Sequence, residues 1–181
     1  MKQAEFGVDD LIVVLLGAPT RSPGLVDKIT GITRLEKLIY ILDVETDVGQ
    51  VLTDSPEFVP HNFGPFSQKV YQAIDILASA NLVTDSSQID VSNDESWETG
   101  KYIDDEPDQQ YTSREISLTE RGRRYYSALE AEFGSDVVSI VSTVKDRFGS
   151  LPLTQLVRYV YQRHPDQIEN SIIRNKVLGQ K

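Results

Sequence analysis

The sequence predicts a mostly α-helical fold that carries one small antiparallel β-hairpin, and three observations support this class. Apolar residues recur at helical spacing over most of the 181 residues. Two short apolar runs, at 82–84 and 114–118, lie on either side of a single acidic segment and can pair as strands. The chain has no cysteine, which excludes disulfide scaffolds, zinc fingers, iron–sulfur clusters and cysteine nucleophiles.

The first two helices are predicted from their apolar spacing and their flanking residues. A pair of acids precedes the apolar run 11–16, where carboxylates favour the start of a helix, and Gly17 ends the run. A Gly- and Pro-rich connection then leads to Thr33 and Glu36, which have the spacing of a capping box. Apolar residues at helical spacing extend this second helix to about residue 45.

The third helix follows a segment with strand character. Residues 57–63 are predicted to be extended, and a Gly-Pro step then places Pro65 at the start of a helix over 65–80. Asn81 is predicted to be the left-handed cap of that helix. The chain therefore passes from the third helix directly into the first strand of the hairpin.

The second half of the chain is predicted to be helical. Thr119 opens a helix that Gly134 breaks, and apolar spacing predicts two more helices over 137–148 and 153–161. One further short helix is expected within 167–181.

The formal charge of -10 is concentrated in one insert, the segment 85–110. From Asp85 to Asp108 the charged residues are nine acids and Lys101, so most of the net charge lies there. One interpretation is a solvated loop; the other is an acidic arm that docks on a basic partner or imitates a phosphate backbone. The charge excludes a uniformly basic coat for nucleic acid.

Three helices, a hairpin and a following helix are the element order of a winged-helix domain. In that architecture the third helix presents its outer face and the hairpin forms the wing. The run Ile-Ser-Leu-Thr-Glu-Arg-Gly-Arg at 116–123 resembles the second wing strand and next helix of many bacterial and archaeal winged-helix proteins. Winged helices bind proteins as well as DNA, so this likeness concerns the fold.

The connection between the second and third helices is longer than the 3–4-residue turn of a plain helix-turn-helix. The chain has Leu-Glu-Lys-Leu-Ile-Tyr at 35–40, then Phe58, then Asn-Phe-Gly-Pro-Phe-Ser at 62–67 with Val-Tyr at 70–71. This combination resembles the domain shared by SocA-type antitoxins, also called Panacea, and by YwgA-like proteins. Residues 156–165 resemble the end of the YwgA-like branch. The resemblance implies an antitoxin or adaptor that binds a partner protein, with DNA binding in some members.

We expect a winged-helix-like domain over 1–134, with the acidic insert at 85–110, and a C-terminal helical extension over 135–181. The extension either packs on the domain or mediates dimerisation. Tyr159 and Tyr161 are the candidates for a homodimer interface.

DNA binding would use the outer face of the third helix and the residues just after the wing. Glutamine and serine can read base edges, while basic side chains meet phosphates. Solvated side chains and surface ion pairs are the plainer alternative for these residues, and the acidic wing would repel a phosphate backbone. The candidates are Ser67, Gln68, Lys69, Gln72, Arg121, Arg123 and Arg124.

Protein binding would use aromatic side chains near the long connection between the second and third helices (residues 45–64), together with the acidic insert. Interfaces are rich in aromatic residues, and an acidic arm would steer a basic partner. The alternatives are that the aromatic residues belong to the domain core and that Trp97 folds back onto the domain. The candidates are Phe58, Phe63, Phe66, Tyr71, Trp97, Asp104, Asp105 and Glu106.

No catalytic, cofactor-binding or metal-binding residue is predicted. The two histidines, His61 and His164, have no metal-ligand spacing to other His or Glu residues, and no phosphate-binding glycine loop is present. His61 is expected to be a half-buried histidine bonded to backbone.

No apolar run approaches the ~20 residues that span a bilayer, and we expect a cytoplasmic protein. The leading hypothesis is a non-enzymatic winged-helix interaction protein, antitoxin-like or adaptor-like, that binds a partner protein such as a basic toxin or a nucleic-acid enzyme. The alternative is a DNA-binding transcriptional regulator that uses helix 65–80.

Overall fold

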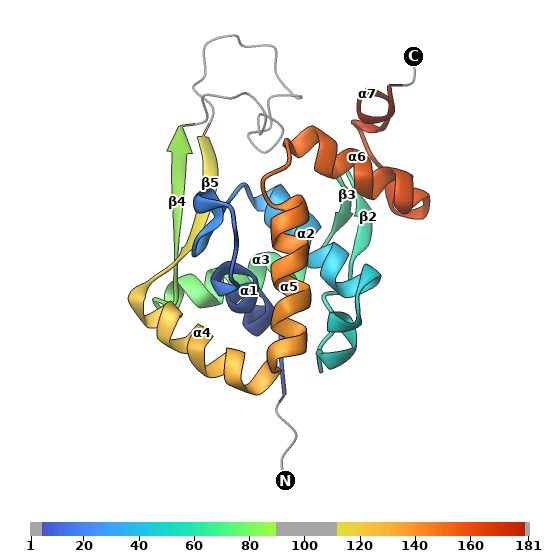
Figure 1. Cartoon of the computed structure of the whole chain (residues 1–181). Helices are drawn as coiled ribbons and strands as arrows, with labels where there is room; N and C mark the ends of the chain where they lie inside the picture. Colours follow the sequence, from blue (N-terminus) through green and yellow to red (C-terminus); the bar gives the residue numbers. More distant parts are fainter. Residues whose placement is uncertain (1–4, 90–111, 180–181) are drawn as a thin grey trace.

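The computed structural model describes residues 5–89 and 112–179, and the described chain is mostly helical with two small antiparallel sheets, which confirms the predicted fold class (Figure 1). The helices are α1 (Val8–Gly17), α2 (Ile32–Glu45), α3 (Gln68–Ser79), α4 (Glu120–Phe133), α5 (Ser135–Phe148), α6 (Leu153–Arg163) and α7 (Arg174–Leu178). The strands are β1 (Lys28–Thr30), β2 (Val59–His61), β3 (Gly64–Phe66), β4 (Val83–Ile89) and β5 (Thr112–Leu118). Short 3-10 turns occupy Pro23–Leu25, Asp47–Val51 and Pro165–Ile168.

Helix α1 is the centre of the core. Every side chain from Leu11 to Leu16 is fully buried, because α3, α4 and α5 pack around this helix. The acids predicted at its start are in place, and Asp10 accepts a hydrogen bond from the Gly7 amide (2.9 Å) and another from the Tyr125 hydroxyl. Burial and this hydrogen bond raise the pKa of Tyr125.

Helix α2 starts two residues earlier than predicted. The capping box is wrong: the N-cap is Gly31, whose φ of 99° turns the chain out of β1, and Thr33 lies inside the helix. Such a φ is strained for residues with a Cβ, which explains the glycine. Glu36 makes its hydrogen bonds to other partners, described below, rather than to the first turn of α2.

The predicted hairpin is confirmed as β4 paired antiparallel with β5, with Asp85 opposite Ile116. The sequence missed β1, which pairs with β5 on its other side and puts Ile29 opposite Ile116. The resulting sheet has the order β1-β5-β4. Three helices, the hairpin and then α4 follow each other in the order expected for a winged-helix-like domain (Figure 1).

Pro65 does not start the third helix. It lies in β3, opposite Pro60 in β2, and the two strands form a separate ribbon. Proline is tolerated there because, among the strands that the structure describes, β2 and β3 pair only with each other and no second neighbour needs the missing amide. Helix α3 begins after Ser67 and ends before Asn81, whose φ of 56° confirms the predicted left-handed cap.

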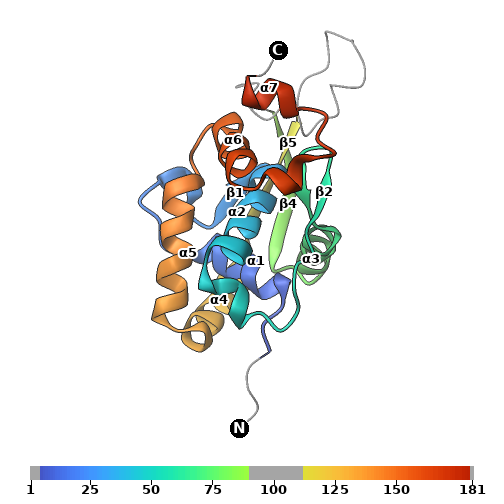
Figure 2. The ribbon, with the colours of Figure 1, turned by 90° about the vertical axis from the view of Figure 1, so that its right-hand side faces the viewer.

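The C-terminal helices share the core of the first helices. Val141 of α5 and Leu156 and Val160 of α6 are fully buried in the same cluster as the side chains of α1 and α2. Figure 2 shows α5 and α6 lying beside α2, on which both helices pack. Tyr161 is also buried, and its hydroxyl lies 2.6 Å from the Ser171 hydroxyl. The proposed dimer contact through Tyr161 is therefore wrong, because its ring is needed in the core. The short helix expected within 167–181 is α7, which follows the 3-10 turn at Pro165–Ile168.

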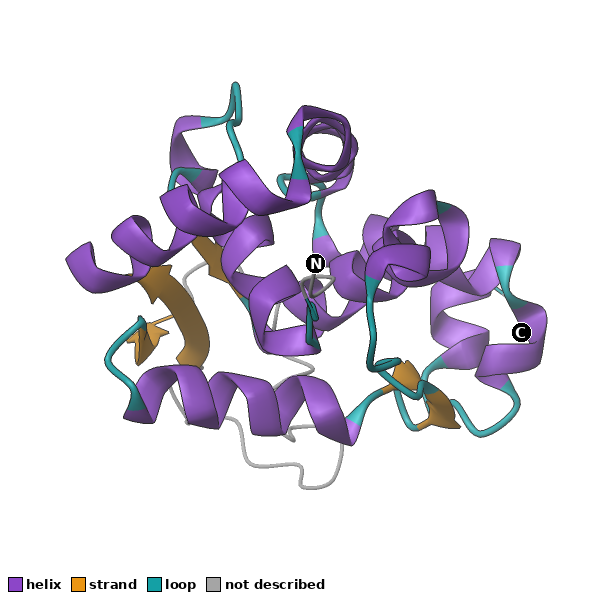
Figure 3. Ribbon diagram, turned by 90° about the horizontal axis from the view of Figure 1, so that it is seen from below, coloured by secondary structure: helices purple, strands orange, loops and turns teal. Residues whose placement is uncertain are grey.

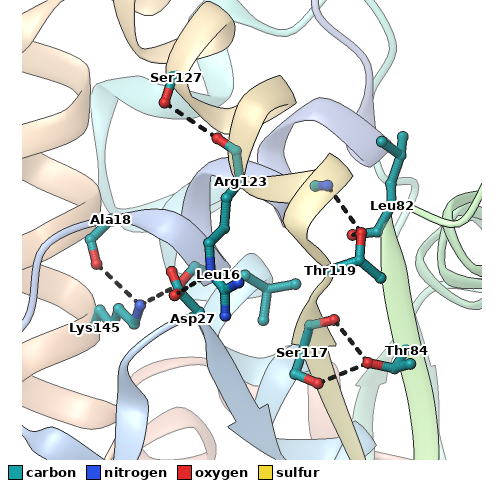
Figure 4. Close-up of polar contacts among 11 residues, drawn as sticks. Leu16, Ala18, Asp27, Leu82, Thr84, Ser117, Thr119, Arg123, Ser127 and Lys145 are labelled. Atoms are coloured by element: carbon teal, nitrogen blue, oxygen red, sulfur yellow. Dashed lines mark hydrogen bonds and ion pairs between the residues drawn. The ribbon is translucent and has the colours of Figure 1, made fainter.

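A buried lysine closes the end of α1. The ammonium of Lys145, on α5, donates to the carbonyl oxygens of Leu16 (2.6 Å) and Ala18 (3.0 Å), as Figure 4 shows. Carbonyls at the C-terminal end of a helix lack partners within the helix, and they carry partial negative charge that attracts a cation. Burial lowers the pKa of Lys145 to about 8, although Asp27 and Asp146 oppose this shift.

We expect stability to depend on Lys145 ionisation between about pH 7 and about pH 9. Over this range the folded chain loses the Lys145 proton while the unfolded chain keeps it, so the free energy of unfolding rises with pH by about 1 kcal/mol. Lys145→Met removes this contribution. Urea unfolding of both proteins at the two pH values measures it, and an equal pH increment in the variant would contradict the assignment.

Gly122 allows α4 to lie directly against the end of the wing. The Leu82 carbonyl accepts a hydrogen bond from the Thr119 amide (3.0 Å), and the Thr119 hydroxyl caps α4 by accepting from the Gly122 amide at 2.9 Å (Figure 4). A Cβ on residue 122 would lie 2.0 Å from the Leu82 carbonyl oxygen. The sequence run at 116–123 therefore requires glycine for a close backbone approach.

Gly122→Ala is expected to lower the free energy of unfolding by about 1–3 kcal/mol, because overpacking outweighs the better helix propensity of alanine. Gly24→Ala is the matched control, since nothing lies within 4 Å of its added Cβ. Urea unfolding measures both variants. Equal stabilities of Gly122→Ala and the parent chain would show that the clash relaxes without cost.

Candidate partner-binding surface

The candidate surface is built on α3, and a buried polar network fixes where α3 starts. The Lys37 ammonium donates to the Pro65 carbonyl (2.6 Å) and to the Glu36 carboxylate (3.1 Å). The other oxygen of Glu36 accepts from the Ser67 amide at 2.9 Å. Lys37 and Ser67 are 0% exposed and Glu36 is 3% exposed, so this ion pair is completely enclosed.

Ser67 connects this network to α3. Its hydroxyl donates to the Pro56 carbonyl and accepts from the Val70 amide (3.2 Å), which makes Ser67 the N-cap of the helix. The ribbon, the N-cap and α2 are thus held together by the charged residues of the run at 35–40. This corrects the expectation that Ser67 reads DNA bases, because its side chain is inaccessible.

A row of rings lies where the ribbon meets α3. The ring centroids of His61 and Phe66 are 4.8 Å apart, and those of Phe66 and Tyr71 are 5.3 Å apart. The Arg114 guanidinium of β5 lies 6.0 Å from the centre of the Tyr71 ring. We call His61, Phe66 and Tyr71 the aromatic row. His61 is exposed and lies against Phe66, so the expectation of a half-buried histidine is wrong.

Phe58 and Phe63 belong to the inner side of the ribbon. Both are half-buried and pack against the core, and Phe58 meets the edge of Tyr40 at a centroid distance of 5.0 Å. The predicted aromatic set is therefore divided: these two rings support the fold, while the aromatic row lies closer to the surface.

The outer side of α3 is polar or acidic around one exposed apolar side chain. Gln68, Gln72 and Asp75 are exposed, and Ile76 is 60% exposed. We call these four residues the α3 face. Figure 3 shows α3 running from the β2–β3 ribbon to the three-stranded sheet, so the α3 face lies between these two features.

Lys69, the basic residue of α3, is held by acids of the connection between α2 and α3. Its ammonium lies 2.6 Å from the Asp54 carboxylate and 2.8 Å from that of Glu57, and it also donates to the Ser55 carbonyl (3.1 Å). These hydrogen bonds raise the pKa of Lys69. Its charge is therefore compensated within the chain.

Two of the arginines that follow the β4–β5 hairpin also form ion pairs within the chain. Arg123 pairs with Asp27 at 2.7 Å (Figure 4), and Arg124 pairs with Glu120 one turn away on α4. Arg121 is exposed, and it makes no hydrogen bond or ion pair with the residues that the structure describes. Two of the three arginines predicted to contact phosphate are thus already paired with acids of this chain.

The remaining partner-binding candidates belong to the acidic insert. Trp97, Asp104, Asp105 and Glu106 fall within residues 90–111, outside the described residues. Their predicted roles stay predictions.

A hollow with a volume of about 280 Å³ lies between the end of α2 and α5. Its lining is mainly apolar and includes Glu45 and Arg147. Both carboxylate oxygens of Glu45 are occupied, by the Tyr159 hydroxyl (2.6 Å) and by His164 Nε2 (2.7 Å). Tyr159 therefore ties α6 to α2, a structural contact that sequence spacing did not reveal.

Within residues 5–89 and 112–179, His, Asp and Glu side chains form no group of three that could bind a metal ion. Among these same residues, the structure has no helix with the length and apolar character needed to cross a membrane.

Comparisons with known proteins add no relative: no protein-family model, no curated protein and no solved structure matches this chain significantly.

Proposed function

We propose that the chain is a cytoplasmic, non-enzymatic interaction protein of winged-helix type, which binds a partner protein through the α3 face and the aromatic row. Its role would be that of an antitoxin or adaptor, as in the SocA-type and YwgA-like proteins that its sequence resembles. The partner would be a basic protein, such as a toxin or a nucleic-acid enzyme.

The observation that carries this proposal is the state of the charges around α3. Lys69 is neutralised by Asp54 and Glu57, while Asp75 and the exposed Ile76 face outward. A phosphate backbone is bound by cations that release its counterions, and the α3 face offers none. The exposed Ile76 and the aromatic row instead suit a protein interface, where aromatic residues are enriched and lysine is depleted.

DNA binding by a transcriptional regulator is the second candidate, and Arg121 is the observation in its favour. An exposed arginine just after the wing is placed where a backbone contact would be made in a winged-helix regulator. Arg123 and Arg124 would have to leave Asp27 and Glu120 to join it.

The proposal is tested by capture from a nuclease-treated lysate of the source cells, followed by reconstitution of the complex from purified components. We expect a stoichiometric complex with one basic protein. A parallel titration uses mixed-sequence duplex DNA at low salt. Tight, salt-sensitive binding that is lost in Lys69→Ala and Arg123→Ala would contradict the proposal. It would support the alternative, a DNA-binding transcriptional regulator.

A further inference from the structure

The hollow between the end of α2 and α5 is a pocket that the proposed function does not use. Its volume of about 280 Å³ is at the small end of the range for small-molecule sites. Side chains from three helices line it, among them Ile41 and Glu45 of α2, Val144 and Arg147 of α5, and Tyr159 of α6. Figure 2 shows α5 and α3 on opposite sides of α1, so this pocket is separate from the α3 face.

The apolar walls of the pocket are side chains that also belong to the core or pack against it. Val144 and Phe148 are buried, while Ile140 and Tyr159 are half-buried and lie against the same cluster. An apolar group is more favourable than water against such walls, because its own surface is also removed from solvent. The walls therefore suit a ligand with a compact apolar body.

Glu45, one of two charged residues in the lining, is already engaged within the chain. One carboxylate oxygen accepts from the Tyr159 hydroxyl (2.6 Å), and the other lies 2.7 Å from His164 Nε2. Burial and the contact with Glu45 raise the pKa of Tyr159, so its hydroxyl stays protonated and continues to donate. Because both oxygens of Glu45 have partners, the pocket does not favour a cationic ligand.

Arg147 is the charged residue of the lining that remains available. Its guanidinium lies 4.8 Å from the centre of the Phe148 ring and 5.9 Å from that of Tyr159. Within residues 5–89 and 112–179, Arg147 is exposed and forms no ion pair with a carboxylate. Aromatic rings attract a guanidinium but do not replace an anionic partner, so its fork of donors can still bind a planar carboxylate.

We propose that this pocket binds a small monocarboxylate with an aryl or branched aliphatic body. The body contacts the apolar walls supplied by α2, α5 and α6, and the carboxylate pairs with the Arg147 guanidinium. Glu45 fixes the orientation of the ligand, because its carboxylate repels a second one and leaves the side of Arg147 as the favourable place. This site goes beyond the proposed function and does not depend on it.

The test uses 3-phenylpropionate and its neutral amide, 3-phenylpropanamide, each titrated into the full chain and followed by NMR. The two probes share their apolar body and differ in charge. We expect the acid to bind in the millimolar range or more tightly, as is usual for so small a ligand, and to shift the methyl signals of Ile140 and Val144. Its affinity should be at least about tenfold higher than that of the amide, because a charge-assisted bidentate contact is lost in the amide.

Arg147→Gln isolates the charge of the guanidinium. We expect this variant to bind the acid and the amide about equally, with the amide affinity of the parent chain, which would show that the pocket itself is intact. Arg121→Gln is the matched control, since Arg121 is likewise exposed and makes no ion pair with the residues that the structure describes. The control should keep the full preference for the acid.

Equal affinities of the acid and the amide for the parent chain, or an unchanged preference for the acid in Arg147→Gln, would overturn the assignment of the carboxylate to Arg147. No binding of either probe, or methyl shifts confined to other parts of the chain, would overturn the pocket as a binding site. The comparison of the two probes on the parent chain decides the question even where Arg147→Gln does not fold. None of these results involves the partner complex, so the proposed function is tested separately.

Discussion

Lys37→Met is expected to lower the free energy of unfolding by about 3–5 kcal/mol, because it leaves the Glu36 carboxylate buried without its cation. The substitution is close in volume, so the loss reports charge and hydrogen bonding rather than a cavity. It also leaves the Pro65 carbonyl without the ammonium that now lies 2.6 Å away. Urea unfolding followed by circular dichroism is the measurement.

Two further variants show whether burial causes the effect. Lys69→Met removes a lysine that pairs with two acids at the surface, and we expect a much smaller loss. In the double variant Glu36→Gln/Lys37→Met, glutamine keeps an oxygen for the Ser67 amide while the buried charge is gone. The double variant should therefore be more stable than Lys37→Met alone, and an equal or lower stability would contradict the ion-pair account.

Ile76→Glu is expected to weaken the complex with the partner protein by about 2 kcal/mol or more, roughly a 30-fold loss of affinity. The side chain is 60% exposed in the free chain, and under the proposal it is buried when the partner covers the α3 face. A glutamate at this position would place a second carboxylate near Asp75 in a desolvated contact. The stability of the free chain should change by no more than about 0.5 kcal/mol, as is usual for exposed sites.

Elements with long apolar repeats could be predicted from the sequence. The core of α1 is a continuous apolar run, and α5 and α6 repeat their apolar residues at helical spacing, so their existence followed directly. The hairpin was also predictable, because two short runs flank the only strongly acidic segment. In these cases the local pattern and the tertiary packing require the same structure.

The errors arose where tertiary contacts override local signals. Thr33 and Glu36 have capping-box spacing, yet Glu36 is used as an acceptor for Ser67, which is far away in the sequence. Pro65 is well suited to the first turn of a helix, but Lys37 binds its carbonyl and holds it in the ribbon. Strand β1 has only three residues, too few for an alternating pattern to stand out.

The candidate surface was only partly predictable for the same reason. Gln68 and Gln72 are exposed as helical spacing suggests, whereas Ser67 and Lys69 are engaged by residues of the connection between α2 and α3. A signal for the buried network was present: Glu36 and Lys37 lie in a helix that is apolar on nearly all sides from Leu35 to Leu42. Adjacent opposite charges in such a helix indicate an enclosed pair, because single charges are rarely buried.

The most direct test of the account is the affinity of the reconstituted partner complex, measured by calorimetry for the parent chain, Ile76→Glu and Val26→Glu. Val26 is a matched control, since it is 54% exposed and precedes β1 at the opposite edge of the sheet. We predict that Val26→Glu binds like the parent chain and that Ile76→Glu loses most of its affinity. Equal affinities of all three proteins would contradict the claim that the partner covers the α3 face.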